Sequence, residues 1–254
     1  MENKITVIIQ VYNEEKNIAE AIQSGKLLSH DILVIDTEST DNTVEIAKKE
    51  GAQVKSFPNS HYVEPARQFG IEQASGDWVF ILDADERLTP ELAEEIKKIL
   101  PTTHNSYFKI PRQNIFGNKK WLEHGGWWPD LQMRLIKKAD FVSWPSRIHA
   151  TPEIKGTEGH LNNAFKHLFH GDIQQMVQKT GIYENIESDL LFKANRSVST
   201  LILFRKFLGE LSRRLLKRKG YADGDVGVIE SVYQAFSKTI TYIFLYEKKN
   251  SRSV

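Results

Sequence analysis

Short apolar runs that alternate with helical patterns constrain the fold of the first hundred residues more than any other feature. The apolar runs, rich in β-branched residues, cover Ile5 to Val11, Ile32 to Ile35, Gln53 to Phe57 and Trp78 to Leu82. Helical patterns lie between them, at Lys16 to Ser24, Thr43 to Glu50 and Glu64 to Ala74. Strands this apolar, separated by helices, are typical of a parallel sheet that helices cover on both faces. We therefore predict an α/β fold whose ligands lie beyond the carboxyl ends of the strands.

The rest of the chain divides into two parts. Residues 106–170 are less regular and rich in aromatic residues and glycines, and they contain one expected strand, Leu131 to Ile136. After residue 170 the pattern is helical, with helices expected at Ile173 to Ala194, Thr200 to Lys219 and Val226 to Glu247. We therefore place boundaries after residues 105 and 170, and residues 171–254 form a C-terminal helical appendage.

Composition excludes several classes of protein. The net charge of +1 gives no overall attraction to nucleic acid, and the basic residues lack the interleaved aromatics of a strand-binding surface. Without cysteine the chain has no disulfide framework, thiolate nucleophile or Cys-ligated zinc, which is compatible with a reducing compartment. We find no secretory signal and no apolar stretch of about 18 residues, so we expect a cytoplasmic protein without a conventional membrane span.

Two carboxylates, Asp83 and Asp85, follow the fourth apolar run and are separated by Ala84. This position is a strand end, where a parallel sheet places its ligands. Two hard oxygen donors at this spacing suit Mg²⁺ or Mn²⁺ shared with a diphosphate. Taken alone, the pair could equally be a solvated turn, so the interpretation depends on the neighbouring strand ends.

Polar blocks also follow the first two runs. Residues 12–15 read Tyr-Asn-Glu-Glu and residues 36–43 read Asp-Thr-Glu-Ser-Thr-Asp-Asn-Thr. Three acidic strand ends of neighbouring strands would converge on one crevice. Each block has a local alternative, because Asn13, Glu14, Thr40 or Asp41 could simply begin a helix or cap one.

These blocks, together with Glu64 to Trp78, resemble the family 2 inverting glycosyltransferases with a GT-A fold. The resemblance covers the first hundred residues and implies a nucleotide-sugar-binding half at 1–105 and an acceptor-binding half at 106–170. It implies that Tyr12 and Glu14 line the nucleotide site, Asp36 contacts the base, Arg67 borders the nucleotide and Asp85 binds the metal. The donor site so implied comprises Val11, Tyr12, Glu14, Asp36, Arg67, Asp83, Ala84 and Asp85. Gln10, Glu38 and Gln68 depart from residues common in the family, which leaves the base and sugar preference open.

The segment His124 to Leu135 resembles the acceptor segment of lipopolysaccharide-core glucosyltransferases in that family. Lys219 to Gly227 is similar to a glycine-rich loop between two of their C-terminal helices. Inversion needs a base that takes the acceptor proton, and we assign this role to Asp130. Gln132 and Arg134 would share its side of a strand and contact the acceptor. Trp127 and Trp128 would stack on a sugar, although buried packing is equally compatible with either.

Two histidines are further candidates. The resemblance makes His149 and His170 possible contacts of the metal or diphosphate, while a lone histidine is more often structural. We include His149 in the metal set with Asp83 and Asp85.

The expected helix at Thr200 to Lys219 carries apolar residues at spacings of three and four. Its flanks hold Lys206, Arg213, Arg214, Lys217 and Arg218. This amphipathic basic pattern suits either packing on the domain or docking on anionic lipid.

We therefore expect a hexosyltransferase, peripheral on the inner face of the cytoplasmic membrane. It would move glucose or a related hexose from a nucleotide sugar, UDP-linked, to a lipopolysaccharide core or another envelope glycan, with inversion. The alternatives are transfer to a protein or a polyprenyl-phosphate carrier, or a nucleotide-binding scaffold that has lost catalysis.

Overall fold

Residues 4–60, 62–117, 119–145, 150–169 and 173–251 are described by a computed structural model. The chain forms two units: unit 1 comprises Met1–Gln113 and Asp130–His167, and unit 2 comprises Asn114–Pro129 and Leu168–Val254. The predicted boundaries after residues 105 and 170 divide the chain by function, into a donor-binding half, an acceptor-binding half and a helical region. This functional division stays a prediction.

Within the described residues a ten-stranded sheet runs in the order β3-β2-β1-β4-β8-β6-β12-β5, with β7 and β11 paired to β6. The strands are β1 Ile5–Val11, β2 Ile32–Asp36, β3 Gln53–Ser56, β4 Trp78–Asp83, β5 Glu86–Arg87, β6 Tyr107–Phe116, β7 Lys120–Trp121, β8 Asp130–Lys137, β11 Glu158–His160 and β12 Phe165–Phe169. β9 Phe141–Ser143 and β10 Glu153–Ile154 form a separate pair. The first four strands of the order are parallel, as predicted, whereas β8 is antiparallel to β4 and β6 is antiparallel to β8.

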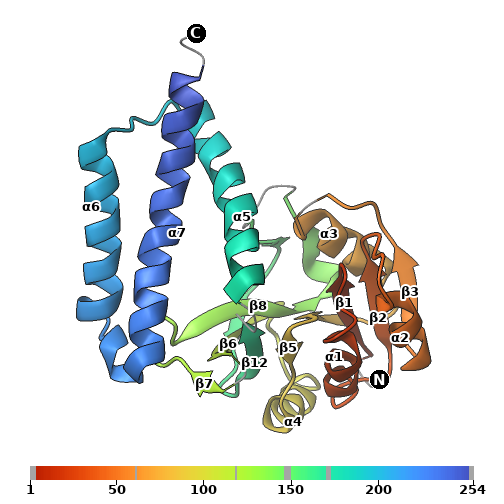
Figure 1. Ribbon diagram of the computed structural model, residues 1–254. Coiled ribbons are helices and arrows are strands. Elements are labelled where there is room, and N and C mark those ends of the chain that lie inside the picture. The colour runs from red at the N-terminus through yellow and green to blue at the C-terminus, as the bar shows by residue number, and fades with distance from the viewer. Residues whose placement is uncertain (1–3, 61, 118, 146–149, 170–172, 252–254) are drawn as a thin grey trace. The chain divides into compact units, whose positions relative to one another are not determined.

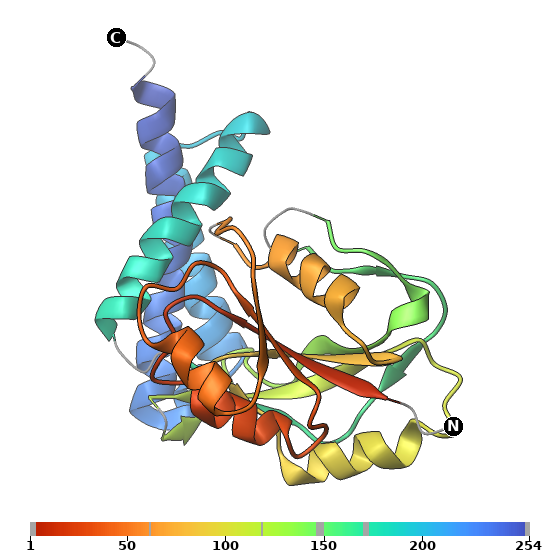
Figure 2. The same ribbon diagram turned by 90° about the vertical axis from the view of Figure 1, so that its right-hand side faces the viewer.

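Helices cover both faces of the parallel half because β1 is apolar on both sides. Ile5, Val7 and Ile9 pack in one cluster with α1 Ile18–Gly25, α2 Thr43–Lys49 and α4 Pro90–Ile99. Ile8 points to the other face and packs with α3 Glu64–Gln73. The turned view in Figure 2 shows α3 across the sheet from α1 and α4. The predicted α/β fold with covered strands is therefore confirmed.

The close approach of α3 to the sheet depends on Gly70. A Cβ at this position would lie 2.8 Å from Ile8 Cγ2 and 3.2 Å from Ile35 Cγ1, closer than packed carbon atoms can approach. Glycine therefore lets α3 lie close to β1 and β2, and this sets the distance between Arg67 on that helix and the sheet edge.

The irregular half contains more regular structure than its sequence suggests. β6 spans ten residues, but its sequence contains Pro111 followed by three polar residues, so the alternation expected of a strand is lost. α4 was also not predicted, although Thr89 caps it by accepting the N–H of Leu92 at 3.3 Å. The predicted strand at 131–136 is confirmed as β8.

Unit 2 contains three long helices, α5 Ile173–Lys193, α6 Thr200–Leu211 and α7 Gly224–Asn250. α7 packs against both α5 and α6, as Figure 1 shows. The predicted helix at 200–219 is α-helical only to Leu211, and it continues as a π-helical segment, Ser212–Lys217, and a 3₁₀ turn, Gly220–Asp223. Among the residues described, no helix combines the length and apolar character needed to cross a bilayer.

Candidate active site

The loops after β1 and β2 are joined to each other at the carboxyl edge of the sheet. The N–H of Asn13 donates to Ser39 Oγ at 2.9 Å, and the N–H of Thr40 donates to Asn13 Oδ1 at 2.7 Å. Asn13 has a φ of 54°, a left-handed conformation that asparagine tolerates better than most residues. Val11 lies opposite Asp36, and Gln10 lies opposite Asp83, so the three strand ends converge as predicted.

Asp41 fixes the second of these loops. Its Oδ1 accepts the N–H of Thr43 at 3.0 Å and its Oδ2 accepts the N–H of Glu15 at 3.2 Å. Burial raises the pKa of Asp41, but the hydrogen bonds from the Thr43 side chain and backbone outweigh it and hold that pKa below its ordinary value. The N-cap of α2 is Asn42, without a side-chain cap, so Asp41 holds the turn that leads into the helix, and the same carboxylate ties the β1 loop to the β2 loop.

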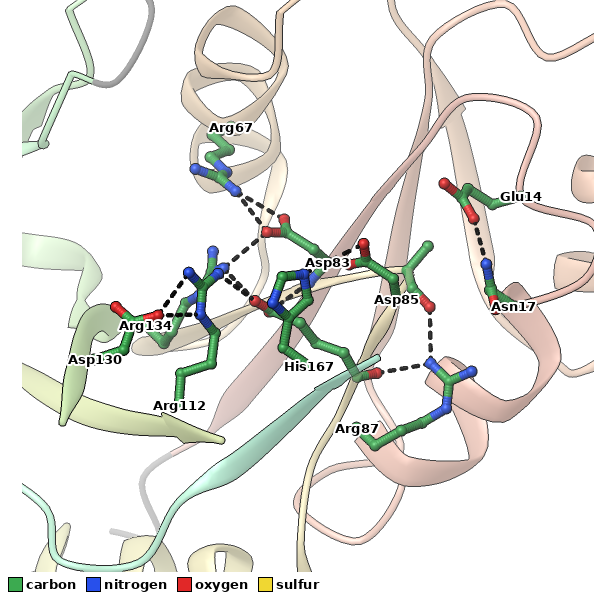
Figure 3. Close-up of polar contacts among 12 residues, drawn as sticks. Glu14, Asn17, Arg67, Asp83, Asp85, Arg87, Arg112, Asp130, Arg134 and His167 are labelled. Atoms are coloured by element: carbon green, nitrogen blue, oxygen red, sulfur yellow. Dashed lines mark hydrogen bonds and ion pairs between the residues drawn. The ribbon is translucent and has the colours of Figure 1, made fainter. Parts of the chain in front are cut away.

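The residues predicted to bind the nucleotide differ in exposure. Tyr12 is 50% exposed, whereas Val11 and Asp36 are buried. Asp36 accepts the N–H of Ser39 at 3.2 Å, so in the structure it shapes its own loop. Glu14 accepts a hydrogen bond from Asn17 Nδ2 at 2.7 Å (Figure 3). Their contacts with a nucleotide stay predictions.

Asp83 is held between two arginines. Arg67 Nη2 donates to its two oxygens at 2.7 and 2.9 Å, and Arg134 Nη2 donates to Oδ2 at 2.7 Å. Burial raises the pKa of Asp83, but the charges of Arg134 and Arg67 lower it by more. The pKa therefore lies below its ordinary value, and the carboxylate is ionised. Both oxygens of Asp83 accept hydrogen bonds from arginines, and its predicted contact with a metal stays a prediction.

Glu86 extends this ion-pair network to Asp130. Glu86 is fully buried, and its Oε1 accepts Arg134 Nη2 at 2.6 Å and lies 3.4 Å from Arg112 Nη1. Arg112 in turn donates to Asp130 Oδ2 from Nε at 2.9 Å and pairs from Nη2 at 2.8 Å. The charges therefore alternate in the order Arg67, Asp83, Arg134, Glu86, Arg112 and Asp130, and all of these but Glu86 are labelled in Figure 3.

Sequence reasoning did not identify Glu86 or Arg112. Glu86 directly follows Asp85, so an acidic residue beside the strand end was a usable signal. Arg112 lies opposite Asp130 in the pairing of β6 with β8. That partnership is visible only once the two strands are known to pair, and the register shifts between Phe108 and Lys109.

Asp130 and Gln132 lie on one side of β8, as predicted. Gln132 Nε2 donates to Asp130 Oδ1 at 2.6 Å, so both oxygens of Asp130 accept hydrogen bonds. Arg134 is 3% exposed and engaged with Asp83 and Glu86, which favours a supporting role over the predicted contact with an acceptor.

The two tryptophans are half-buried and packed within unit 2. Trp127 lies 4.9 Å from the Phe169 ring, and Trp128 meets Trp121 edge-on at 5.2 Å between ring centroids. Packing is therefore part of their role, while stacking on a sugar stays a prediction.

Asp85 is the carboxylate that best fits a divalent cation. Its side chain is 31% exposed, and its Oδ2 lies 3.4 Å from His167 Nε2. Among the described residues no group of three or more metal-ligating side chains gathers. Mg²⁺ and Mn²⁺ are commonly held by one or two carboxylates together with substrate phosphates, so the metal site at Asp85 stays a prediction. His149 and His170 lie outside the described residues.

The family model described as Glycosyl transferase family 2 matches residues 6–152, more than half of the chain. An uncharacterized glycosyltransferase of Rickettsia conorii is 28% identical, over 96% of this chain and 90% of its own length. Another, from Rickettsia prowazekii, is 29% identical over 92% of this chain and 84% of its own.

A solved structure shares the fold. Glucosyl-3-phosphoglycerate synthase from Mycobacterium tuberculosis, solved with Mn²⁺, UDP and glucosyl-3-phosphoglycerate, matches with a TM-score of 0.50 and 16% identity. The match covers 78% of this chain and 82% of the synthase. The α/β domain described above therefore has the GT-A fold.

Proposed function

The chain belongs to glycosyl transferase family 2, and from this membership we propose that it transfers a hexose, glucose or a close relative, from a UDP-linked donor to an envelope glycan such as the lipopolysaccharide core. That the protein is a glycosyltransferase that uses a nucleotide sugar follows from the family and from relatives matched over nearly the whole chain. The hexose, the UDP moiety, the acceptor and inversion are the parts that we propose.

The ion-pair network between Asp83 and Asp130 is the observation that carries the proposal. Glu86 is shared by Arg134, which holds Asp83, and by Arg112, which holds Asp130. The strand-end acidic motif and the predicted base therefore belong to one set of interlocked charges in unit 1. Such a network would hold the donor-side carboxylates and the base in fixed positions, as a displacement at one anomeric carbon requires of its reacting groups.

Asp130 would act as the base in a single displacement. The acceptor hydroxyl oxygen forms a bond to the anomeric carbon, the bond from that carbon to the diphosphate oxygen breaks with its electron pair, and the hydroxyl proton passes to the Asp130 carboxylate. Attack opposite the leaving group inverts the anomeric configuration. The guanidinium of Arg112 pairs with Asp130 and holds the carboxylate at the start of β8.

Asp85 would hold the divalent cation. When bound there with the donor, Mg²⁺ or Mn²⁺ would neutralise the charge that develops on the diphosphate. The synthase of the same fold was solved with Mn²⁺ and UDP. In this chain the partly exposed position of Asp85 after β4 and the nearby His167 support the assignment.

We further propose that α6 docks on anionic lipid, which would bring the enzyme to a glycolipid acceptor. Leu201, Phe204, Leu208 and Leu216 are 77%, 64%, 58% and 60% exposed, an apolar series without cover in unit 2. Arg205 and Lys217 are exposed beside it. An apolar stripe flanked by basic side chains suits the boundary between lipid headgroups and acyl chains.

The burial pattern of the neighbouring helix α7 is further evidence that unit 2 contacts an apolar partner. Its buried positions are mainly small or polar, including Gly227, Glu230, Ser231, Ser237 and Thr241. Its exposed positions include Ile229, Val232, Phe236, Ile243 and Tyr246. A helix that buries polar residues and exposes apolar ones is the reverse of an ordinary surface helix.

A screen of nucleotide sugars tests the proposed function. The full chain is incubated with UDP-, GDP- and dTDP-linked hexoses, with and without Mn²⁺, and diphosphate release is measured. We expect release from a UDP-hexose only when the cation is present. Release that requires a GDP- or dTDP-sugar contradicts the UDP assignment, and the absence of release and transfer with every donor would show a scaffold without catalysis.

A further inference from the structure

We propose that the junction between α6 and α7 positions the sugar acceptor, by clamping the aromatic loop that leads into Asp130. The clamp comprises Arg214, Arg218 and Asp223, and the loop comprises residues 123–129. This inference rests on the proposed function, because it takes the loop as part of the acceptor site. It assigns a role to the glycine-rich segment 219–227, which no step of the transfer reaction uses.

Asp223 is a buried carboxylate, and both of its oxygens contact one loop residue, His124. Its side chain is 3% exposed. Its Oδ2 accepts the backbone N–H of His124 at 2.8 Å, and its Oδ1 lies 2.9 Å from the Nδ1 of the same histidine. Because one carboxylate contacts both the backbone N–H and the ring of His124, it fixes the position of both. Burying a carboxylate is costly, so its hydrogen bonds to the loop are the interactions that offset this cost.

Arg214 and Arg218 hold the next three residues of the loop. The N–H of Gly125 donates to the carbonyl of Arg218 at 2.8 Å, and Arg214 Nη1 donates to the carbonyl of Gly125 at 3.2 Å. The Arg214 guanidinium also lies over the ring of Trp127, 5.1 Å from its centroid. Gly126 has a φ of 89°, and a Cβ there would lie 2.2 Å from Arg218 Nη1, so the arginine occupies the space a side chain would need.

The clamp is itself rigid, because its backbone segments are packed against each other. A Cβ on Gly227 would lie 2.0 Å from the carbonyl oxygen of Gly220, and a Cβ on Gly220 would lie 2.9 Å from the carbonyl oxygen of Arg214. Ser231 Oγ donates to the carbonyl of Gly227 at 2.6 Å. Only glycine permits these approaches, so residues 214–227 form a fixed support for the loop.

The aromatic residues that the clamp orients indicate a sugar as the ligand. The ring of Trp127 lies between the Arg214 guanidinium and Phe169, yet Trp127 is half-exposed, as is Trp128. Half-exposed aromatic rings held by fixed neighbours suit stacking on an apolar sugar face. The loop then continues through Pro129 directly into Asp130, the proposed base. Movement of the loop would therefore displace the stacking rings.

Kinetics of Asp223→Ala and Arg214→Met test the inference, with Asp225→Asn as a matched control on an exposed carboxylate two residues along. Transfer from the UDP-hexose to octyl β-D-glucoside and to deacylated lipopolysaccharide core is measured, with donor hydrolysis in the absence of acceptor. We expect the acceptor KM to rise about 10-fold to 100-fold in both variants, since small displacements cost this much. Donor KM and donor hydrolysis should stay at wild-type values, and Asp223→Asn, which keeps an oxygen acceptor for His124, should recover part of the loss.

Amide hydrogen exchange across residues 124–128 reports on the loop itself, and we expect it to be faster in both variants. An unchanged acceptor KM in a folded variant overturns the positioning role. A wild-type chain that hydrolyses the donor yet transfers to neither acceptor also overturns it, because the loop then has no acceptor to position. A wild-type chain that neither hydrolyses nor transfers from any nucleotide sugar contradicts the proposed function instead. If Asp223→Ala does not fold, Arg214→Met alone decides between these outcomes.

Discussion

At the scale of single residues, Arg134 joins the two parts of the ion-pair network. Its Nη2 bonds to Asp83 at 2.7 Å and to Glu86 at 2.6 Å, and its side chain is 4% exposed. Burial lowers the pKa of Arg134, but the charges of Asp83 and Glu86 raise it by more, so the guanidinium stays charged. Without it, Glu86 would be a buried carboxylate with only the more distant Arg112 as a cationic partner.

We predict that Arg134→Met lowers the free energy of unfolding by about 3–5 kcal/mol, the usual effect of removing one partner of a buried ion pair. Urea denaturation measures it. Lys97→Met is the control, because Lys97 pairs with Glu94 on an exposed helix surface and should change stability by less than about 1 kcal/mol. A loss below about 1 kcal/mol in Arg134→Met would contradict the buried charge network.

The same network predicts how stability depends on pH. The pKa of Asp83 in the folded chain lies below its ordinary value of 3.8, because Arg134 and Arg67 outweigh the effect of burial. A depressed folded pKa means that the unfolded chain takes up the proton first, so this stabilisation is complete above the ordinary value and is lost as the pH falls below it. Urea midpoints between pH 6 and pH 3 should decline, and the decline should be shallower in Asp83→Asn. Equal slopes in the two proteins would contradict the ion pairs.

Asp85 carries the metal assignment, so Asp85→Ala should abolish transfer while the chain still folds. Its side chain is at a strand end and not in the core, and its loss removes the anchor of the leaving diphosphate. Steady-state transfer across a Mn²⁺ titration is the measurement, with thermal melting to show folding. EDTA should reproduce the defect in the wild type. Near-normal turnover in EDTA would contradict the metal assignment.

At the scale of elements, α6 has two interpretations, packing within unit 2 and docking on anionic lipid. Arg213 and Arg214 both pair with Glu210, so they offer little free charge to a surface. Arg205 is exposed beside the apolar series of α6, and Lys217, Arg218 and Lys219 are exposed just beyond the end of the helix. Lipid docking should therefore depend on these residues more than on Arg213 and Arg214.

We predict that Arg205→Gln with Lys217→Gln weakens binding to vesicles that contain anionic phosphatidylglycerol by about 30-fold, since each basic side chain contributes about 1 kcal/mol near such a surface. Vesicle sedimentation at low salt measures it. Lys48→Gln with Lys49→Gln in α2 is the control, and donor hydrolysis should be unaffected in both. Wild-type protein that ignores these vesicles at low salt would show that α6 only packs.

Elements were predictable where local pattern decides them. β1, β2 and β4 are buried along nearly their whole length, so their apolar runs stand out from the sequence. β6 could not be found in this way, because its polar residues face partners in the charged network and not solvent alone. β12 spans only five residues, and its place beside β6 depends on long-range pairing.

At the scale of the whole molecule, the site was predictable in its residue types but not in its connections. Asp83, Asp85 and Asp130 could be selected because they stand at the ends of predicted strands. The partners of Asp83, Arg67 and Arg134, come from 16 and 51 residues away in the chain. Such contacts depend on strand order and register, which a local pattern does not contain. The change of Arg134 from an expected acceptor contact to a buried support is the clearest instance.

The account as a whole depends on Asp130 as the base, and Asp130→Asn tests it most directly. Asparagine keeps the shape and much of the hydrogen bonding to Arg112 and Gln132 but cannot accept the proton. The quantity to measure is the transfer rate at saturating acceptor, divided by the affinity for the donor. We predict unchanged donor affinity and a transfer rate lower by about 10²-fold to 10⁴-fold. Transfer at more than about a tenth of the wild-type rate would contradict the account, because loss of a general base costs at least about 10²-fold.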